Sequence, residues 1–340
     1  MSDRPGAAPP PAGRFVAPFV GGAVAVVAAT GCDGTQSALA PAGPAAERVL
    51  TLFWWMLGGG VLIWATVAAL AVYAIVIERP KYELDPTRWW VIGGGVVAPT
   101  VILTVLLIYG LGLIPPLVRD APPGSLTVEA DGVRWWWRFR YRTPDGPVET
   151  ANELHLPTDE PVQFLLRSED VIHSFWIPPL GGKVDMIPGR ENRLALEADR
   201  AGTFRGACAE YCGASHALMN FDVTTQPREE FDAWLAAQAA PAAEPTSETA
   251  ALGARVFLRS GCGACHAIRG TPADGVVGPD LTHVGGRPTI GAGLLPNNEA
   301  NLVRWIARPD GLKPGAEMPA FDHLPKAELR ALAVYLKSLK

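Results

Sequence analysis

The sequence predicts a multidomain protein with a two-helix transmembrane hairpin, an all-β domain and a C-terminal all-α domain. Three observations support this division. Two long apolar runs stand near the N-terminus, short alternating runs separated by Gly and Pro turns follow them, and the last stretch has apolar residues at helical spacing. The length of 340 residues allows two or three domains, and a content of 49% hydrophobic residues points to membrane spans.

The N-terminal segment, residues 1–31, is typical of a signal peptide. Arg4 and Arg14 precede a small apolar run that ends in Ala-Thr-Gly-Cys at positions 29–32, which is similar to a bacterial lipobox with Cys32 as the lipidated residue. Alanine stands where leucine is usual in such motifs. The alternative is an uncleaved leader with a free cysteine, and in either case the run is too short to predict a third span.

Two apolar runs, residues 49–77 and 90–118, are each longer than the roughly 20 residues that a bilayer core requires. Both are therefore predicted to be transmembrane helices. The loop between them carries Arg79, Lys81 and Arg88, and the positive-inside rule places a basic loop in the cytoplasm. Both ends of the hairpin then emerge on the outer face of the membrane, so the soluble domains are expected there.

Residues 119–238 are predicted to form the all-β domain. Short alternating runs are separated by turns such as 144–146 and 188–189, a pattern typical of a sandwich or barrel. The expected strands are 125–129, 133–141, 153–156, 162–167, 193–197 and 202–207. A short helix over 227–237 closes the domain, and residues 239–248 form a Pro/Ala-rich linker without core-forming residues.

Residues 249–340 are predicted to be helical. Three helices are expected, at 252–258, 298–307 and 326–339. The start of the first helix is open, because Ser247 and Thr249 are both suitable N-cap residues.

A run of potential metal ligands lies near the end of the all-β region. Its members stand three or four residues apart: Cys208, Cys212, His216 and Met219. Thiolate and thioether sulfur favour copper or iron–sulfur sites, whereas imidazole suits copper and zinc. With His173 from a strand-like segment upstream, the set matches what a binuclear copper centre needs. A Cys208–Cys212 disulfide and a zinc site are the alternatives, but structural zinc takes four ligands and leaves Met219 unexplained.

A second motif, Cys262-Gly-Ala-Cys265-His266, is typical of covalent haem attachment. Two cysteines on one helical turn can form thioethers to the macrocycle, and the histidine directly behind them reaches the iron. Met318 is the natural sixth ligand, because a soft thioether sulfur stabilises ferrous iron. Two histidines compete for that position, namely His283 and His323. Taken alone, the motif would also fit a zinc knuckle or a redox pair.

Together these features resemble subunit II of the haem-copper cytochrome c oxidases. The resemblance covers nearly everything after the leader: the hairpin, the aromatic run 135–137, the segment 168–173, the stretch 188–190 and the ligand run. The Cys-x-x-Cys-His motif makes the caa3-type subgroup, whose subunit II carries its own cytochrome c domain, the nearest match. The all-β domain (119–238) is then expected to be a cupredoxin domain and the all-α domain (249–340) a cytochrome c.

The resemblance implies a role for each candidate. The side-chain ligands of the binuclear copper centre, called CuA, are then His173, Cys208, Cys212, His216 and Met219. Glu210 would add its backbone carbonyl, and its carboxylate would face a Mg or Mn site shared with subunit I. Trp135 falls where the family places the aromatic residue through which electrons reach the copper. Trp136 and Trp137 are expected in a buried aromatic core, and His155 is expected to be structural.

The two soluble regions carry opposite net charges. Residues 119–248 contain 12 basic and 21 acidic residues, whereas residues 249–340 contain 11 basic and 7 acidic ones. Opposite charges would favour docking of the haem domain on the copper domain, and the linker would raise its local concentration. Copper reduction by the attached haem is therefore expected to depend on salt. Asp170 and Asp185 are candidates for supporting the ligands or for acidic docking, with turn and surface roles as alternatives.

One departure from the family concerns proton uptake. Members usually carry a glutamate near the start of the second helix, and the corresponding stretch 90–99 has none. Glu78 and Glu83 in the preceding loop are the candidate replacements for it. The residue for proton uptake is therefore left unassigned.

The residues and the resemblance together predict a subunit of a respiratory cytochrome c oxidase in a bacterial inner membrane. It would take electrons from an external cytochrome c or another donor and pass them, through haem c and CuA, to the haem-copper site of subunit I. There oxygen is reduced to water with proton translocation, in a complex that also holds subunit III. A nitric oxide reductase with a similar copper subunit and a free-standing membrane-anchored electron carrier are the alternatives. The sequence shows no catalytic triad, phosphate-binding loop or nucleic-acid surface.

Overall fold

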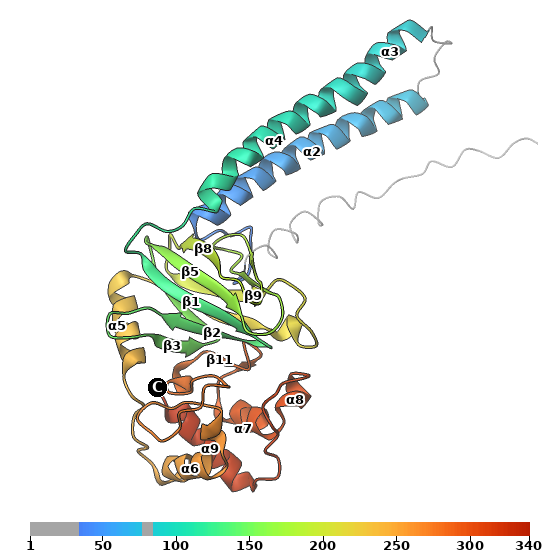
Figure 1. The fold of residues 1–340 in the computed structure, drawn as a ribbon. Helices are drawn as coiled ribbons and strands as arrows, with labels where there is room; N and C mark the ends of the chain where they lie inside the picture. The colour runs from blue at the N-terminus through green and yellow to red at the C-terminus, as the bar shows by residue number, and fades with distance from the viewer. Residues whose placement is uncertain (1–33, 77–83) are drawn as a thin grey trace, which may run out of the picture.

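The computed structural model describes residues 34–76 and 84–340, which form three bodies in a row (Figure 1). A helical hairpin lies at one end, a β-sandwich in the middle and a helical domain at the other end. The predicted multidomain fold class is therefore confirmed. The predicted signal peptide, Cys32 and the loop residues Glu78 and Glu83 lie outside the described residues.

The hairpin is formed by two apolar stretches that run side by side (Figure 1). The first is α2 (Pro44–Val76), and the second consists of α3 (Leu84–Ile92), a π-helical turn (Gly93–Val97) and α4 (Ala98–Leu117). By length and composition, Pro44–Val76 and Arg88–Leu117 are each able to cross a membrane. Helix α2 begins before the predicted span, because proline is well tolerated in the first turn of a helix.

The middle body is a sandwich of two five-stranded sheets, with the strand orders β3-β2-β1-β5-β8 and β4-β10-β9-β6-β7. The strands are β1 (Leu126–Val133), β2 (Trp136–Tyr141), β3 (Val148–Ala151), β4 (Glu153–Pro157), β5 (Pro161–Ser168), β6 (His173–Trp176), β7 (Val184–Met186), β8 (Asn192–Glu197), β9 (Gly202–Cys208) and β10 (Asn220–Gln226). The pairs β1–β5 and β4–β10 are parallel. Helix α5 (Arg228–Ala239) packs against β3 and β4.

The expected strand 133–141 is in fact two strands joined by a tight turn. Val133 pairs with Trp136, so Arg134 and Trp135 form the tip of the β1–β2 hairpin. The sequence did not indicate this turn, because the apolar run contains no Gly or Pro at these positions. As a consequence, Trp135 lies at the end of the sheet and not within it.

The core of the sandwich is aromatic. Trp137, Phe175 and Phe221 are fully buried, and the Phe221 ring centroid lies 5.0 Å from that of Trp137 and 5.2 Å from that of Phe175. Trp137 is thus in the core, as predicted. The prediction was wrong for Trp136, which is half-buried with the Arg138 guanidinium 4.9 Å from its ring centroid. Successive residues of a strand face opposite sides, so two adjacent tryptophans cannot share one core.

The third body contains α6 (Glu248–Arg259), α7 (Glu299–Ala307), α8 (Pro309–Leu312) and α9 (Lys326–Ser338). Ser247 is the N-cap of α6, because its side chain accepts a hydrogen bond from the amide of Ala250. Long loops join the helices and include a small hairpin of β11 (Thr289–Ile290) and β12 (Leu295–Pro296).

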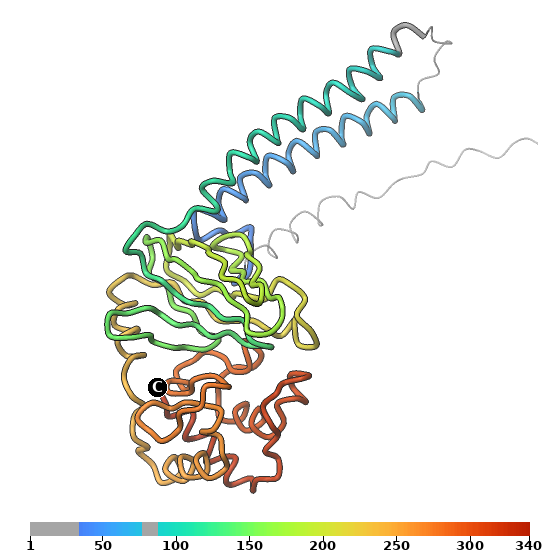
Figure 2. The backbone as a smooth tube through the Cα atoms, in the orientation of Figure 1, coloured from blue at the N-terminus to red at the C-terminus, as the bar shows by residue number. Residues whose placement is uncertain are grey.

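The predicted linker, residues 239–248, is packed against the helical domain. The amide of Ala242 donates to the carbonyl of Arg269 at 2.9 Å, and His283 Nε2 lies 3.0 Å from the carbonyl oxygen of Ala240. Figure 2 shows the chain continuing from the sandwich into the helical domain along one side of the molecule. The linker is therefore hydrogen-bonded to the helical domain and is not a free tether.

Candidate metal and haem sites

The candidate copper ligands are brought together by two neighbouring strands and one loop. His173 begins β6 and Cys208 ends β9, and these strands pair with Phe175 opposite Cys208. The other ligands follow in the loop to β10, namely Cys212, His216 and Met219. Because adjacent strands lie about 4.8 Å apart, this pairing places His173 beside the loop.

The ligand atoms converge on a pair of sulfurs. Cys208 Sγ lies 3.7 Å from Cys212 Sγ, 3.7 Å from His173 Nδ1 and 3.2 Å from the carbonyl oxygen of Glu210. Cys212 Sγ lies 3.5 Å from His216 Nδ1 and 3.8 Å from Met219 Sδ. The two cysteines are free thiols, so the disulfide alternative is wrong. Each sulfur contacts the other, one histidine and one further donor.

The two thiols share their protons unequally. The hydrogen bond with Cys212 lowers the pKa of Cys208 far below its ordinary value, although burial opposes this shift. The same contact raises the pKa of Cys212. Soft metals bind the thiolate form of cysteine, and the lowered pKa of Cys208 favours that form.

Asp170 holds the ring of His173 in place. Its carboxylate accepts hydrogen bonds from the amides of Val171 and Arg134 and lies 2.8 Å from His173 Nε2. Burial would raise the pKa of Asp170, but these bonds lower it overall. Burial would likewise lower the pKa of His173, and its contacts with Cys208 and Asp170 raise it. The opposite ring nitrogen, Nδ1, is left facing the sulfurs, an arrangement that orients metal-binding histidines.

The carboxylate of Glu210 is at the surface and forms an ion pair. Its Oε2 lies 3.5 Å from Nζ of Lys183, which also pairs with Asp185 at 2.9 Å. All three side chains are close to half exposed. Asp185 therefore takes part in a surface ion pair, and it lies opposite Ser174, the residue after His173, in the β6–β7 pairing.

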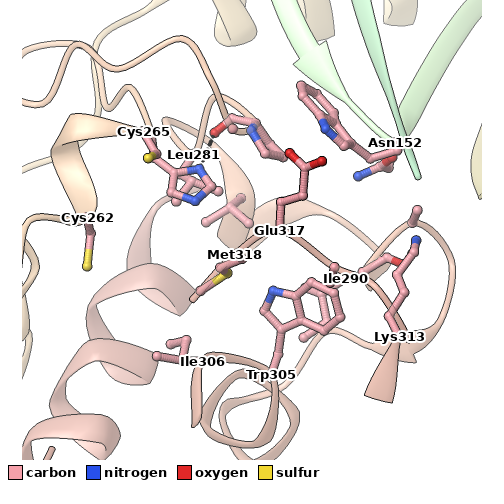
Figure 3. Close-up of a pocket in the computed structure, with 18 of the residues that line it drawn as sticks. Asn152, Cys262, Cys265, Leu281, Ile290, Trp305, Ile306, Lys313, Glu317 and Met318 are labelled. Carbon is pink, nitrogen blue, oxygen red and sulfur yellow. Dashed lines mark hydrogen bonds between the residues drawn. The ribbon is translucent and has the colours of Figure 1, made fainter. Parts of the chain in front are cut away.

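The haem-attachment motif lines a cavity of about 260 Å³ that lies mainly in the helical domain and is bordered by the β1–β2 turn and Asn152 of the sandwich (Figure 3). Cys262, Cys265 and His266 lie on its wall, and both cysteines are free thiols. His266 Nδ1 lies 2.7 Å from the carbonyl oxygen of Pro279, which makes Nδ1 the donor and leaves Nε2 for a metal. Burial lowers the pKa of His266, so the ring stays neutral.

Met318 reaches this cavity from the loop between α8 and α9. Its competitors do not line the cavity: the His283 ring faces the linker carbonyl of Ala240, and His323 is exposed on the surface. The cavity thus offers two thiols, an imidazole and a thioether between apolar walls, which is the donor set that fits a covalently attached haem.

Trp135 contacts both sites. Its Nε1 donates to the carbonyl of Cys212 at 3.0 Å, and its ring also lines the cavity of the helical domain. Two glycines allow close contact on either side, because a Cβ atom at Gly213 would lie 3.0 Å from the indole and one at Gly315 would lie 2.8 Å from it. Both glycines have positive φ, a conformation that favours glycine. Trp135 is 9% exposed as a result.

The contacts across the junction are mainly charged side chains that donate to backbone carbonyls. Arg138 donates to Val276, and Arg205 donates to Gly293 at 3.1 Å. A buried ion pair of Arg287 with Glu153, at 4.0 Å, joins the same two domains. Buried contacts are screened less than exposed ones. The salt dependence expected from net charge should therefore be small.

His155 is structural, as expected: its ring stacks on Trp234 with 3.9 Å between ring centroids. Sequence reasoning missed Lys313, whose ammonium bridges the two soluble domains. A single lysine in a loop gives no sequence signal of burial. The buried sulfur and imidazole cluster, the Cys-x-x-Cys-His cavity and the apolar hairpin together define a membrane-anchored electron-transfer protein.

Comparisons with known proteins identify the family. The family described as cytochrome C oxidase subunit II, periplasmic domain, matches residues 145–225, and the cytochrome c family matches residues 250–340. Cytochrome c oxidase subunit 2 of Alkalihalophilus pseudofirmus is 37% identical over 328 residues, which cover 92% of this chain and 93% of the relative. The same subunit of Bacillus subtilis is 38% identical over 228 residues, which cover 64% of this chain and 63% of that protein.

A crystal structure of the periplasmic domain of subunit II of Bradyrhizobium japonicum cytochrome oxidase shares 30% identity with this chain. The match covers 36% of this chain and 97% of that domain, with a TM-score of 0.33. On the sequence comparisons, the chain belongs to the cytochrome c oxidase subunit 2 family. The resemblance expected from its motifs is thus confirmed, and the chain is a subunit of an oxidase with a fused cytochrome c domain.

Proposed function

We propose that this chain takes electrons from an external cytochrome c or a similar donor and delivers them to the haem-copper site of subunit I. The route runs through haem c and binuclear CuA, and it supports reduction of oxygen to water with proton translocation. The chain would act in a bacterial inner membrane with subunits I and III, its soluble domains outside. The observation that carries the proposal is the position of Trp135, which contacts the copper loop and the haem-site cavity at once.

The copper site is proposed to use every donor of the converging set. Cys208 and Cys212 would bridge two copper ions, and the remaining donors would be His173, His216, Met219 and the carbonyl of Glu210. Two thiolates, two imidazoles and a thioether favour copper over harder metals, and they exceed the four ligands of a structural zinc site. The short contacts between these donors support a geometry that changes little with redox state.

The haem site is proposed to use Cys262 and Cys265 as thioether attachments and His266 with Met318 as axial ligands. When bound, the haem and the copper pair supply one-electron redox chemistry. The chain's own residues orient these groups and exclude water. The carbonyl of Pro279 fixes the His266 ring, and the Cys212 carbonyl fixes the Trp135 indole between the two sites.

The position of the helical domain also directs the order of electron transfer. The helical domain covers Trp135, which packs against Gly315 and is largely removed from solvent. An external donor therefore meets the haem domain and does not contact Trp135 directly. We infer that electrons enter at the haem and that Trp135 relays them internally to the copper.

A Mg or Mn site at the carboxylate of Glu210, shared with subunit I, is also proposed. This carboxylate is close to half exposed and pairs with Lys183 at 3.5 Å. A divalent cation would have to displace that lysine. Docking of subunit I on this surface is therefore expected to rearrange Lys183.

Rapid mixing of the purified oxidase with a reduced donor tests the route. In the Trp135→Phe variant, we expect the haem to be reduced at the normal rate and the copper to be reduced about tenfold or more slowly. Trp234→Phe is the matched control, because Trp234 stacks on His155 at the far side of the sandwich core and does not line the haem-site cavity. Normal copper reduction in Trp135→Phe would contradict the relay.

Metal and gas measurements test the rest of the proposal. The native complex should contain, for each copy of this chain, one covalent haem and two coppers in addition to the copper of the haem-copper site in subunit I. A single zinc in place of copper would contradict the proposed centre. Consumption of oxygen, compared with consumption of nitric oxide, decides between an oxidase and a nitric oxide reductase.

A further inference from the structure

Lys313 lies where the two soluble domains meet, in the loop that follows α8. Its side chain is buried, with 4% of the residue exposed. Its Nζ donates hydrogen bonds to the carbonyls of Trp135 at 2.6 Å, Leu218 at 2.9 Å and Gly291 at 2.9 Å. An ammonium group has three donors, and all three are used. Figure 3 shows Lys313 beside Ile290 and below Asn152, away from the two attachment cysteines.

The acceptors of Lys313 belong to both domains. Trp135 and Leu218 are parts of the sandwich, and Gly291 is part of the helical domain. A single cation therefore holds together two main-chain segments of one domain and one segment of the other. No carboxylate of the described residues forms a salt bridge with it at 4.0 Å or less.

Burying a cation without a carboxylate partner is unfavourable. Burial lowers the pKa of Lys313 to about 7, although the nearby Cys212 acts in the opposite direction. The three carbonyl dipoles offset this cost only while the two domains are docked, since two of them come from the sandwich. The hydrogen bonds of Lys313 to the sandwich therefore form only when the two domains are docked, whereas a surface lysine is solvated in either state.

The atoms that Lys313 holds lie on the proposed electron path. The carbonyl of Leu218 directly precedes Met219, and the carbonyl of Trp135 belongs to the residue whose indole binds the copper loop. The next residues extend the same contact: Ser215 Oγ donates to the carbonyl of Pro314 at 2.7 Å, and Gly315 packs on Trp135. Met318, the proposed axial ligand, follows in the same loop.

We propose that Lys313 is a positioning residue that locks the haem domain onto the copper domain in the arrangement that transfers electrons. The inference rests on the proposed function, because it concerns the step between the two redox sites. Electron transfer slows steeply as the donor and the acceptor move apart. Small displacements of reacting groups cost on the order of 100-fold in rate in comparable cases.

The test is Lys313→Met in the complete oxidase, a change that keeps an unbranched side chain and removes the ammonium. We expect the copper and haem spectra, the haem content and the reduction of haem by the external donor to remain normal. Electron transfer from haem to copper should slow at least tenfold. Lys326→Met, at an exposed position of the same domain, is the matched control and should behave like the wild type.

Hydrogen exchange separates positioning from a general role in folding. In Lys313→Met, amide exchange should rise in residues 133–137 and 213–219 and stay unchanged in the rest of the sandwich. Ser215→Ala, which removes only the neighbouring hydrogen bond, should slow the same electron-transfer step by a smaller factor. This second variant decides the matter if Lys313→Met does not assemble.

A normal rate of haem-to-copper transfer in an assembled Lys313→Met oxidase would overturn the inference. A normal rate in Ser215→Ala, where Lys313→Met fails to assemble, would do the same. Failure of the proposed function would give a different result from failure of this inference. In that case the wild-type oxidase itself would show no electron transfer from haem to copper.

Discussion

The two redox sites of this chain are built in opposite ways. The copper-ligand candidates lie at the rim of an aromatic core, with contacts of 3.2–3.8 Å between their donor atoms. The haem-site residues come from several loops and helices. Apolar residues that line its cavity are also members of the core of the helical domain, namely Val284, Ile290, Leu302, Ile306 and Leu336.

This difference shows how the size of a cofactor affects the fold around it. A small metal cluster binds to donors that the sheet and one loop have already brought together. A macrocycle instead fills space between the residues that form the domain core, and a group bound only by the folded state stabilises that state. The two domains should therefore respond differently to the loss of their cofactors.

The largest effect is expected from Cys262→Ser combined with Cys265→Ser. This change should abolish covalent haem attachment and destabilise the helical domain by about 4 kcal/mol, comparable with deleting a large core side chain. The melting temperature of that domain should fall by roughly 15 °C or more. Calorimetry measures this melting temperature. The unfolding transition and the copper content of the sandwich are the internal controls. An unchanged melting temperature would show that the haem is not part of the core.

A smaller effect on stability is expected from Cys212→Ser. Loss of one sulfur from the pair should abolish binuclear copper binding, as metal analysis and the optical spectrum would report. The sandwich should lose only about 1–2 kcal/mol, because its aromatic core does not depend on the metal. Haem content should stay normal. Unfolding of the whole sandwich would mean that the copper site is as integral to its domain as the haem site is.

Gly315→Ala tests the contact between the two sites. The new Cβ would lie 2.8 Å from the Trp135 indole, at a residue with a φ of +79°. Overpacking of this kind costs about 1–3 kcal/mol, and it should weaken docking and slow haem-to-copper transfer about tenfold. Gly311→Ala is the control, because the nearest atom to its Cβ would be 3.9 Å away. Equal rates in both variants would show that the packing on Trp135 does not set the electron-transfer distance.

The smallest effect concerns acid stability of the sandwich. Burial raises the pKa of Glu129, but the hydrogen bond from Arg142 and the charges of Arg167, Arg142 and Arg140 lower it overall, below 4.5. A carboxylate with a lowered pKa stabilises the fold above its unfolded-state pKa and loses this contribution as the pH falls through its folded-state value.

Glu129→Gln should therefore destabilise the sandwich at pH 7 by less than about 1 kcal/mol, the scale of a surface ion pair. The difference from the wild type should disappear in acid. Urea unfolding of both proteins at neutral pH and at about pH 3 measures this, with the helical domain as the internal control. A difference that persists in acid would attribute the effect to packing and not to charge.

The sequence alone identified what depends on short-range spacing. The four candidates Cys208, Cys212, His216 and Met219 stand within twelve residues, so their convergence on one point followed from the local pattern. The Cys-x-x-Cys-His motif and the helices around it were equally local. The alternating strands and the apolar spans predicted the three bodies and their order, because periodicity reports which side of an element is buried.

The tertiary structure decided everything that joins distant parts of the chain. The turn at Arg134 and Trp135 carries no turn residue, and its position depends on the pairing of β1 with β2. Lys313 binds a carbonyl 178 residues away, and no local pattern encodes such a contact. The packed linker and the burial of Trp135 likewise arise from docking. The local sequence determines which residues can bind copper and haem. The electron path between the two sites depends on which surfaces of the two soluble domains pack together.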